Sequence, residues 1–585
     1  MDNTGILSRL QITRATDSFL RWRSSRKRIV HEPALRAELF SAEQMEQHGI
    51  RLARQHRLRP CEASNLLLRR LADNEVLLAR SCELLTRAAL TSRRVTPAAE
   101  WLLDNFYLIE EQIRTARLHL PRGYSRELPR LASGPSAGLP RVYDIALEII
   151  SHGDGRVDSA SLSRFVAAYQ SVMPLTLGEL WAIPIMLRLA LIENLRRVAS
   201  RVIADWNDRN LAEDWADHMA EIAEQDAKSV VLSVADMARS TPPMTSSFVA
   251  ELTRRLQGQS AALALPLTWI EQLLSESGLS IVHLVQMEAQ QQAADQVSIS
   301  HSICSLRLLS ATDWRDFVES MSIVDHTLRE DPAAVYASMD FATRDHYRHV
   351  VERLARRSDK PEDSIARTAI ELAQRATDTQ QISAHVGYYL IDQGLPELEA
   401  GIGAQITLTE VRRWLQTCAP LSVYLSLALL FSLALAIPFV QLARASGWHG
   451  WLLVLIGLPT LLMTSQLGIG LVNWLVTRSV PPNRLPRLDF AEGIPAQSRT
   501  LVVVPTLIGS AQDVEELCEG LEVRFLANRD RHLHFALLTD FMDAASEVLP
   551  TDAALLARAV PDLRPVRHRL GRRVVHLLPR HAERT

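Results

Sequence analysis

The sequence predicts a mainly α-helical protein that continues into a two-helix transmembrane hairpin and then into the start of a Rossmann-like α/β fold. Three observations lead to this prediction. Apolar residues recur at three- and four-residue steps through most of residues 1–410, as amphipathic helices require. Two uncharged apolar stretches follow, each longer than the roughly twenty residues that cross a membrane as a helix. After them the pattern changes to short β-branched runs, which are typical of buried parallel strands.

Composition argues against several classes of function. The 585 residues carry 64 Lys+Arg and 67 Asp+Glu, a formal net charge of −3, so no basic excess favours nucleic acid as a partner. The five cysteines are scattered and form no C-x-x-C pair. Their distribution argues against a disulfide framework and a zinc site, and it suits the reduced cytoplasm.

The N-terminus shows no signal peptide, because arginines from Arg9 to Arg28 interrupt every apolar run. We therefore expect the helical region 1–410 to lie in the cytoplasm. These arginines are expected to line a solvated helix face, and contact with anionic lipid is the alternative.

Helix signals recur within region 1–410. Residues 64–84 carry leucines and valine at helical spacing. Thr96 and Pro97 predict a helix start, with threonine as the cap and proline at the first helical position. The Gly- and Pro-containing segment 134–138 predicts a flexible break.

The most distinctive segment of this region is the apolar run at residues 174–197. Glu179, Pro184 and Arg188 interrupt it, so it predicts buried helices with a proline kink rather than a membrane span. Glu179, Arg188 and Glu193 are predicted to form an internal set of ion pairs. A surface that couples to the membrane part is the alternative.

The two apolar stretches at 415–443 and 448–477 predict transmembrane helices joined by a short link. Positive charge flanks the outer ends, and a single arginine lies between the stretches, so both outer ends are expected in the cytoplasm. The flanking arginines are Arg412, Arg413, Arg478, Arg484 and Arg487. Two buried core helices are the alternative interpretation.

A partial α/β domain is predicted at residues 498–555. Residues 500–505 form a short strand that ends at a proline, and residues 534–538 form a second strand. Between them Ser510 caps a helix, with Asp513 at the reciprocal position of a capping box. A strand, a helix and a strand in about forty residues make half of a nucleotide-binding unit.

Candidate ligand-binding residues lie where these strands end. Pro505, Thr506 and Asp540 fall at the carboxyl ends, where open parallel sheets bind ligands. An acidic side chain there can accept hydrogen bonds from a base or ribose, or help place a metal that binds pyrophosphate. Asp543 is a further candidate, and a helix cap or turn is the alternative role for such an aspartate.

Several segments resemble the cyclic β-1,2-glucan synthase family. The segments 487–495, 499–506 and 535–544 resemble the entry to the glycosyltransferase domain of that family and its next strand. The segments 96–106, 110–114, 128–129 and 175–197 resemble the family's N-terminal region. The resemblance covers about residues 30 to 555.

The resemblance implies a bacterial inner-membrane glucosyltransferase, a multi-pass protein whose N-terminal region and transferase segment are cytoplasmic. It implies UDP-glucose as the donor, a growing β-1,2-glucan as the product, a GT-A-type fold and Mg²⁺ or Mn²⁺ as cofactor. Pro505, Thr506 and Asp540 would line the UDP pocket, with Asp540 toward the uridine and Asp543 as a weaker candidate.

The last residues depart from the family. Residues 556–585 are rich in arginine and contain no lysine, unlike the family or a packed domain. We expect an early end after a change of reading frame, and a basic tail that binds lipid or nucleic acid is the alternative. The chain as given is therefore expected to be inactive alone. There are two rival interpretations. One is a helical membrane scaffold or regulatory protein without catalytic activity, and the other is a membrane sensor.

Three other residue groups are expected to be structural. The segment from Asp154 to Asp158 resembles a calcium loop but lacks the remaining ligands, so a turn is expected. His346 and His349 are spaced to share a metal on a helix but lack a third ligand. His301 and Cys304 have the spacing of a nucleophile and its base, yet a buried thiol is expected.

Overall fold

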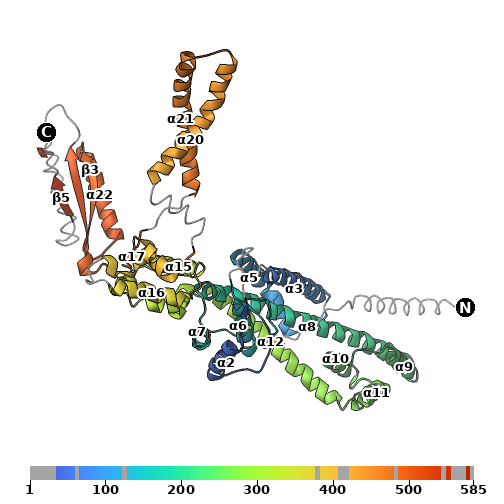
Figure 1. Ribbon diagram of the computed structural model, residues 1–585. Helices are drawn as coiled ribbons and strands as arrows, with labels where there is room; N and C mark the ends of the chain where they lie inside the picture. The colour runs from blue at the N-terminus through green and yellow to red at the C-terminus, as the bar shows by residue number, and fades with distance from the viewer. Residues whose placement is uncertain are drawn as a thin grey trace. The chain divides into compact units, whose positions relative to one another are not determined.

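The computed structural model describes residues 35–59, 65–91, 93–120, 128–375, 382–405, 420–479, 485–541, 549–551, 553–554 and 575–579. The chain divides into two compact units, Met1–Thr327 and Leu328–Thr585 (Figure 1). The predicted boundaries of the helical region, the spans and the α/β segment remain predictions.

The described residues of the first unit are mainly helical, as the sequence predicts. The helices are α2 (Ala42–Gln55), α3 (Leu66–Leu90), α4 (Pro97–Asp104), α5 (Phe106–His119), α6 (Arg141–His152), α7 (Ser159–Gln170), α8 (Leu177–Gln225), α9 (Val230–Ser240), α10 (Ser246–Leu256), α11 (Ala264–Ser275), α12 (Ile281–Ala311), α13 (Trp314–Met321) and α14 (Ile323–Leu328), the last crossing the unit boundary. The cap at Thr96 is confirmed: its hydroxyl accepts the Ala99 amide at 3.4 Å. A two-residue ladder, β1 (Leu58–Arg59) with β2 (Arg130–Leu131), was not predicted.

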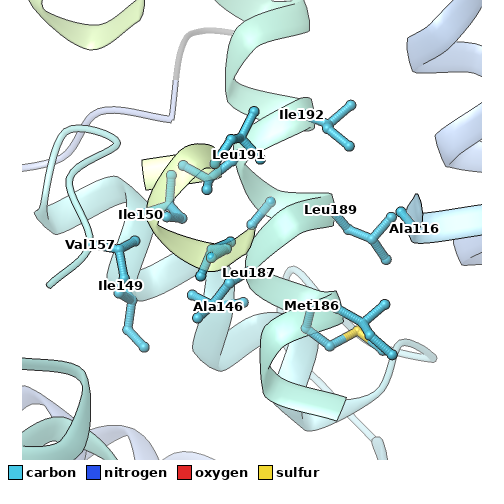
Figure 2. Close-up of a cluster of buried hydrophobic side chains, with 14 of the residues drawn as sticks. Ala116, Ala146, Ile149, Ile150, Val157, Met186, Leu187, Leu189, Leu191 and Ile192 are labelled. Atoms are coloured by element: carbon cyan, nitrogen blue, oxygen red, sulfur yellow. The ribbon is translucent and has the colours of Figure 1, made fainter. Parts of the chain in front are cut away.

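Helix α8 forms the axis of the first unit. Its first half is buried on every side, the pattern of a helix inside a core. Figure 2 shows Leu187 and Leu191 pointing toward α6 while Leu189 points toward Ala116 of α5. The prediction of several helices is wrong, because α8 runs through Pro184 as one 49-residue helix. Packing on all sides outweighs the roughly 3 kcal/mol that an interior proline costs.

The charges on this buried half do not form one set. Glu179 accepts the Arg141 guanidinium at 2.5 and 2.6 Å, whereas Arg188 donates to Gln112 at 2.8 Å. Glu193 is fully buried and has partners of its own on α3 and α8. The structural interpretation is therefore confirmed, and the pairing within the set is wrong because each charge faces a different helix.

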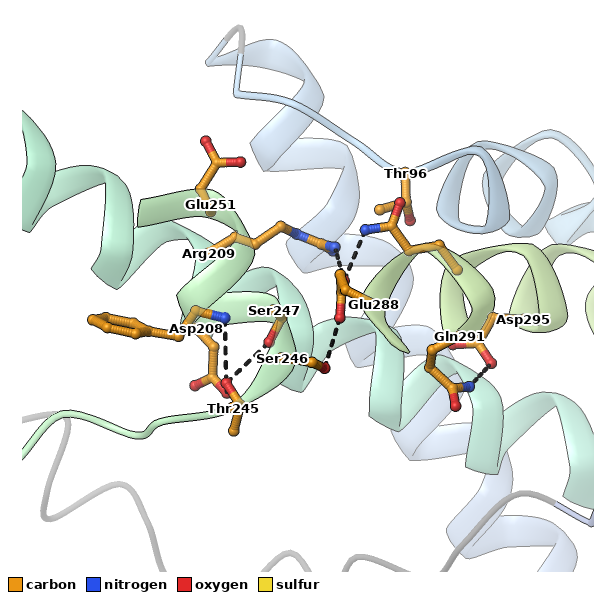
Figure 3. A network of polar contacts seen from close by, with 12 residues as sticks. Thr96, Asp208, Arg209, Thr245, Ser246, Ser247, Glu251, Glu288, Gln291 and Asp295 are labelled. Atoms are coloured by element: carbon orange, nitrogen blue, oxygen red, sulfur yellow. Dashed lines mark hydrogen bonds and ion pairs between the residues drawn. The ribbon is translucent and has the colours of Figure 1, made fainter. Parts of the chain in front are cut away.

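The second half of α8 packs against α9, α10 and α12. Figure 3 shows the polar network on this side, in which Glu288 of α12 accepts Arg209 at 3.0 Å and Ser246 at 2.9 Å. Asp205 lies nearby, and its burial, followed by the charge of Glu288, raises its pKa to about 7. A carboxyl group that prefers its proton near neutrality therefore sits between α8 and α12.

After α14, the described residues of the second unit form four α-helices before residue 406: α15 (Phe341–Ala355), α16 (Glu362–Gln374), α17 (Val386–Ile391) and α18 (Leu395–Ile402). The buried Asp331 carboxylate ties their loops together. It accepts His385 Nδ1 at 2.8 Å and the Val386 amide at 2.9 Å. Burial raises the pKa of Asp331, but these hydrogen bonds outweigh it and hold the value below its usual range.

Two apolar helices follow, α20 (Pro420–Ala445) and α21 (Trp451–Ser479). Both are long and apolar enough to cross a membrane. Only 17% and 11% of their most apolar windows are buried, so the alternative of two core helices, which would be mostly buried, is disfavoured. A hairpin is confirmed, since the two helices pack directly on each other.

Small residues form the seam between α20 and α21. Ser432 of α20 and Thr464 of α21 are buried there, and Thr464 donates to the Ser432 carbonyl at 3.2 Å. A methyl group at Gly468 would lie 2.6 Å from Ser432 Oγ and 3.2 Å from the Ala428 carbonyl, so only glycine fits. Small residues that let backbones approach closely are the usual contact between membrane helices.

The last described part is a parallel sheet. The strands β3 (Thr500–Ile508), β4 (Leu533–Phe541) and β5 (Val575–Pro579) lie in that order, and α22 (Ala511–Ala527) connects β3 to β4. Cys518 and Leu521 of α22 pack on Phe535 and Leu537 of β4. The predicted strand–helix–strand is therefore present, with parallel strands.

Candidate functional site

The candidate site lies at the carboxyl edge of β3 and β4, where α22 begins. Ser510 caps this helix: its hydroxyl accepts the Asp513 amide at 3.2 Å, and Asp513 accepts the Ser510 amide at 2.8 Å. The predicted capping box is confirmed. The box uses the Asp513 carboxylate to hold the turn that leads from the sheet edge into α22.

The strands run further than predicted. We expected β3 to end at Pro505, but it continues to Ile508, so that prediction is wrong. Among the described strands β3 lies at the edge of the sheet. Proline is tolerated in an edge strand because the amide it lacks can face the unpaired side. Pro505 and Thr506 thus lie inside β3, before the strand ends at Ile508.

The register decides which candidate residues share a face. Thr506 pairs with Thr539, and Leu507 pairs with Asp540. Val502 and Val504 face α22, so the two-residue alternation of a strand places Thr506 on that same face. Pro505 and Asp540 fall on the opposite face. The structure therefore places Pro505 and Asp540 on one face of the sheet and Thr506 on the other.

Asp540 is half-buried near the carboxyl end of β4, as predicted. Asp543 lies outside the described residues. A small hollow, lined by Arg499, Thr500, Leu501 and His534, lies at the opposite, amino end of the same strands. We do not assign the ligand to this hollow, because parallel sheets bind ligands where loops and helix N-termini gather, beyond the carboxyl ends.

The expected turn at 154–158 is confirmed. Asp154 adopts a left-handed backbone with φ of 48°, and Asp158 caps α7 through the Ser161 amide at 2.8 Å. Asp158 thus has a capping role, and within the described residues neither aspartate belongs to a group of three metal-ligating side chains.

The remaining pairs give mixed outcomes. Within the described part of the chain, His346 and His349 belong to no group of three metal-ligating side chains. The expectation of a buried thiol at Cys304 is wrong, since the side chain is exposed on α12. The ring of His301 turns to the Asp154 carbonyl, 3.3 Å from Nδ1. An exposed thiol whose neighbour points elsewhere lacks the arrangement of an activated nucleophile.

Sequence reasoning missed one cluster of chemistry-bearing side chains in the first unit. His48, Glu148 and His152 place one potential metal-ligand atom each within 4.8 Å of the others. The four-residue spacing of Glu148 and His152 on a helix was the only signal available. His48 comes from a different helix, and no local pattern could have joined it to them.

The comparisons with known proteins identify the family. No model of a known protein family matches the chain. The chain is 34% identical over 477 residues to the cyclic β-(1,2)-glucan synthase NdvB of Rhizobium meliloti (strain 1021). The match covers 80% of this chain and 16% of the length of that protein. Through this matched region, the chain belongs to the cyclic β-(1,2)-glucan synthase family.

Proposed function

We propose that this chain contributes the helical, membrane and nucleotide-binding start of a glucosyltransferase that builds cyclic β-1,2-glucan from UDP-glucose. The observation that carries the proposal is the parallel strand–helix–strand that follows the membrane hairpin, with Asp540 at its carboxyl edge. This is the position at which Rossmann-like and GT-A-type folds bind nucleotides. The family relationship supports a sugar-transfer reaction.

Asp540 is the residue proposed to bind the uridine. Its carboxylate can accept two hydrogen bonds, and it shares a sheet face with Pro505, whose ring offers an apolar surface beside a base or ribose. Thr506 faces α22, so its contribution would come through its backbone. Asp543 remains a candidate on position alone.

The proposal includes a metal ion, and the described residues alone would not supply all of its ligands. Mg²⁺ requires about six oxygen ligands, and of the two aspartates described here Asp540 lies near the end of β4 while Asp513 is used in the cap of α22. The other ligands would be the diphosphate, water and further residues. A Mg²⁺ or Mn²⁺ ion bound there would offset charge on the departing diphosphate.

The membrane arrangement follows from charge. With Arg478 and Arg487 after the second span and Arg444 alone in the link, we propose that both outer ends face the cytoplasm of a bacterium. The donor edge would then have access to cytoplasmic UDP-glucose. The nascent glucan and the lipid bilayer would be the other partners.

Donor binding by the purified full chain tests this proposal. Titration of UDP-glucose with Mn²⁺ into the chain in detergent, followed by calorimetry, should show binding that disappears without the metal. Asp540→Asn should weaken the affinity about 10- to 100-fold, since a hydrogen bond to a charged group contributes about 1.5–3 kcal/mol. Glu519→Gln is the matched control, because it removes an exposed carboxylate from the middle of α22.

Each outcome bears on a named rival. Binding that Asp540→Asn weakens and Glu519→Gln leaves unchanged supports the donor site. Equal affinity for UDP-glucose in all three proteins would show that Asp540 is not part of the donor site. No binding by the wild-type chain would favour the scaffold or regulatory interpretation.

A further inference from the structure

The His48–Glu148–His152 cluster joins two helices that are far apart in the sequence. His48 lies on α2, while Glu148 and His152 lie on one face of the last turn of α6. The segment before α2 docks on the end of α6: the Phe40 amide donates to the His152 carbonyl at 3.3 Å. The Phe40 ring also stacks on the His152 ring at 3.8 Å. These contacts hold the end of α6 that carries Glu148 and His152 against the segment before α2.

One of the two separations around Glu148 matches that of a tetrahedral metal site, and the other is shorter. His48 Nε2 lies 2.8 Å from Glu148 Oε2, and His152 Nε2 lies 3.4 Å from the same oxygen. With zinc–ligand bonds of about 2.0–2.1 Å, the ligand atoms of a tetrahedral site lie about 3.3 Å apart. His152 Nε2 therefore already lies at the required separation from Glu148, whereas His48 Nε2 would have to move about 0.5 Å out of its hydrogen bond to admit an ion.

The tautomer of His152 points to a positive occupant. Its Nδ1 lies 2.6 Å from the Glu38 carbonyl, which can only accept, so Nδ1 carries the hydrogen. A neutral His152 then turns the lone pair of Nε2 toward the Glu148 carboxylate. Two electron-rich atoms at 3.4 Å repel unless a cation lies between them. A carbonyl that fixes the outer nitrogen is the usual support of a metal-binding histidine.

The charge partners of Glu148 also distinguish it from the buried carboxylates around α8. Glu179 and Glu193 are neutralised by arginines. Within the described part of the chain, only His48 and His152 are cationic or potentially cationic partners of Glu148. The side chains of His48, Glu148 and His152 are 14%, 31% and 11% exposed, so an ion can enter and keep a water ligand.

We propose that His48, Glu148 and His152 bind one divalent transition-metal ion of the zinc class, with water in the fourth position. Two imidazoles and a carboxylate suit Zn²⁺, and three protein ligands leave one position open. The ion would join α2 to α6 across 100 residues of sequence. The alternative occupant is a proton, which would make His152 an imidazolium paired with Glu148.

Metal titration of the purified full chain separates the two occupants. The chain is stripped with a chelator, and Zn²⁺ is added in competition with a chromophoric chelator. Because the chain has 18 histidines, weak sites are expected, and the variants isolate the tight one. The variants are His48→Ala and the nearly isosteric Glu148→Gln. The matched control is His283→Ala, which removes an exposed histidine from α12.

The wild type and His283→Ala should bind one Zn²⁺ tightly. Loss of an outer-shell partner of a metal ligand lowers metal affinity about 10- to 100-fold. His48→Ala and Glu148→Gln remove ligands themselves, so each should lower the affinity for Zn²⁺ by at least that factor. Zn²⁺ should also raise the melting temperature of the wild type but not that of Glu148→Gln. Circular dichroism measures both melting temperatures, and its spectrum also shows whether the variant is folded. Equal Zn²⁺ affinity in the wild type and both variants would overturn the proposal and leave the imidazolium–carboxylate pair.

Discussion

The Glu193→Gln substitution tests the account of the first unit most sharply. The Glu193 carboxylate is fully buried and accepts the Arg70 guanidinium at 2.9 and 3.1 Å and the Asn74 amide at 2.8 Å. Arg196 and Arg197 of the next turn of α8 each donate to it at 2.8 Å. Burial raises the pKa of Glu193, but these arginines outweigh burial and hold it well below its usual range.

The substitution keeps the shape of the side chain and removes its charge. Arg70, Arg196 and Arg197 then face one another around a neutral amide in a core position. Breaking a buried pair by removing one partner costs about 3–5 kcal/mol. An exposed ion pair such as Arg87–Glu83, whose side chains are 66% and 64% exposed, contributes at most about 1 kcal/mol.

Hydrogen exchange followed by mass spectrometry measures this cost locally, without assuming that a membrane protein of two units unfolds in one step. Peptides from α3 and α8 in Glu193→Gln should lose protection by roughly two to three and a half orders of magnitude, the equivalent of about 3–5 kcal/mol. Peptides from α15 and α16 should not change. Glu83→Gln, the matched control, should shift protection less than tenfold.

Protection in Glu193→Gln that equals the wild type would refute the reasoning. It would mean that the three arginines reach solvent without cost, and that apolar packing alone holds α8 in place. A uniform loss across both units would also contradict it, because the effect should remain in the helices that contact Glu193.

Two further predictions concern the seam between α20 and α21 and the effect of pH. Gly468→Val should force α20 and α21 apart, because the added carbon would lie 2.6 Å from Ser432 Oγ, and the thermal stability of the chain in detergent should therefore fall. Gly470→Val is the control: nothing lies within 4 Å of the added carbon there, so thermal stability should not change. Since burial raises the pKa of Asp205 from 3.8 to about 7, folding favours its protonated form, and stability should fall as pH rises through that range. Asp205→Asn should flatten this part of the profile of melting temperature against pH, whereas Asp236→Asn, on an exposed side chain, should not.

Features with local causes were predictable from the sequence. The Thr96 cap, the Ser510–Asp513 capping box and the two long apolar stretches each follow from neighbouring residues. The parallel orientation of β3 and β4 also follows, because a helix of the length of α22 can return the chain from the carboxyl end of one strand to the amino end of the next.

Features that depend on distant contacts were not predictable. Pro184 lies inside a continuous helix because side chains from several other helices surround α8. The face that Asp540 shares with Pro505 depends on the register, and one residue of slip would reverse it. His48 and Glu148 meet across 100 residues, so no spacing rule applies to them.

The central claim is that the chain crosses the membrane twice and returns the edge around Asp540 to the cytoplasm. Cysteine labelling of spheroplasts with a membrane-impermeant maleimide tests it. One reporter is Ser446→Cys, exposed in the link between α20 and α21, and the other is Glu519→Cys, exposed on α22. Both are placed in a background whose natural cysteines, including the exposed Cys304, are replaced by serine.

We predict that Ser446→Cys is labelled in intact spheroplasts and that Glu519→Cys is labelled only after permeabilisation. Labelling of Glu519→Cys in intact spheroplasts would contradict the account, because an edge outside the cytoplasm has no access to UDP-glucose.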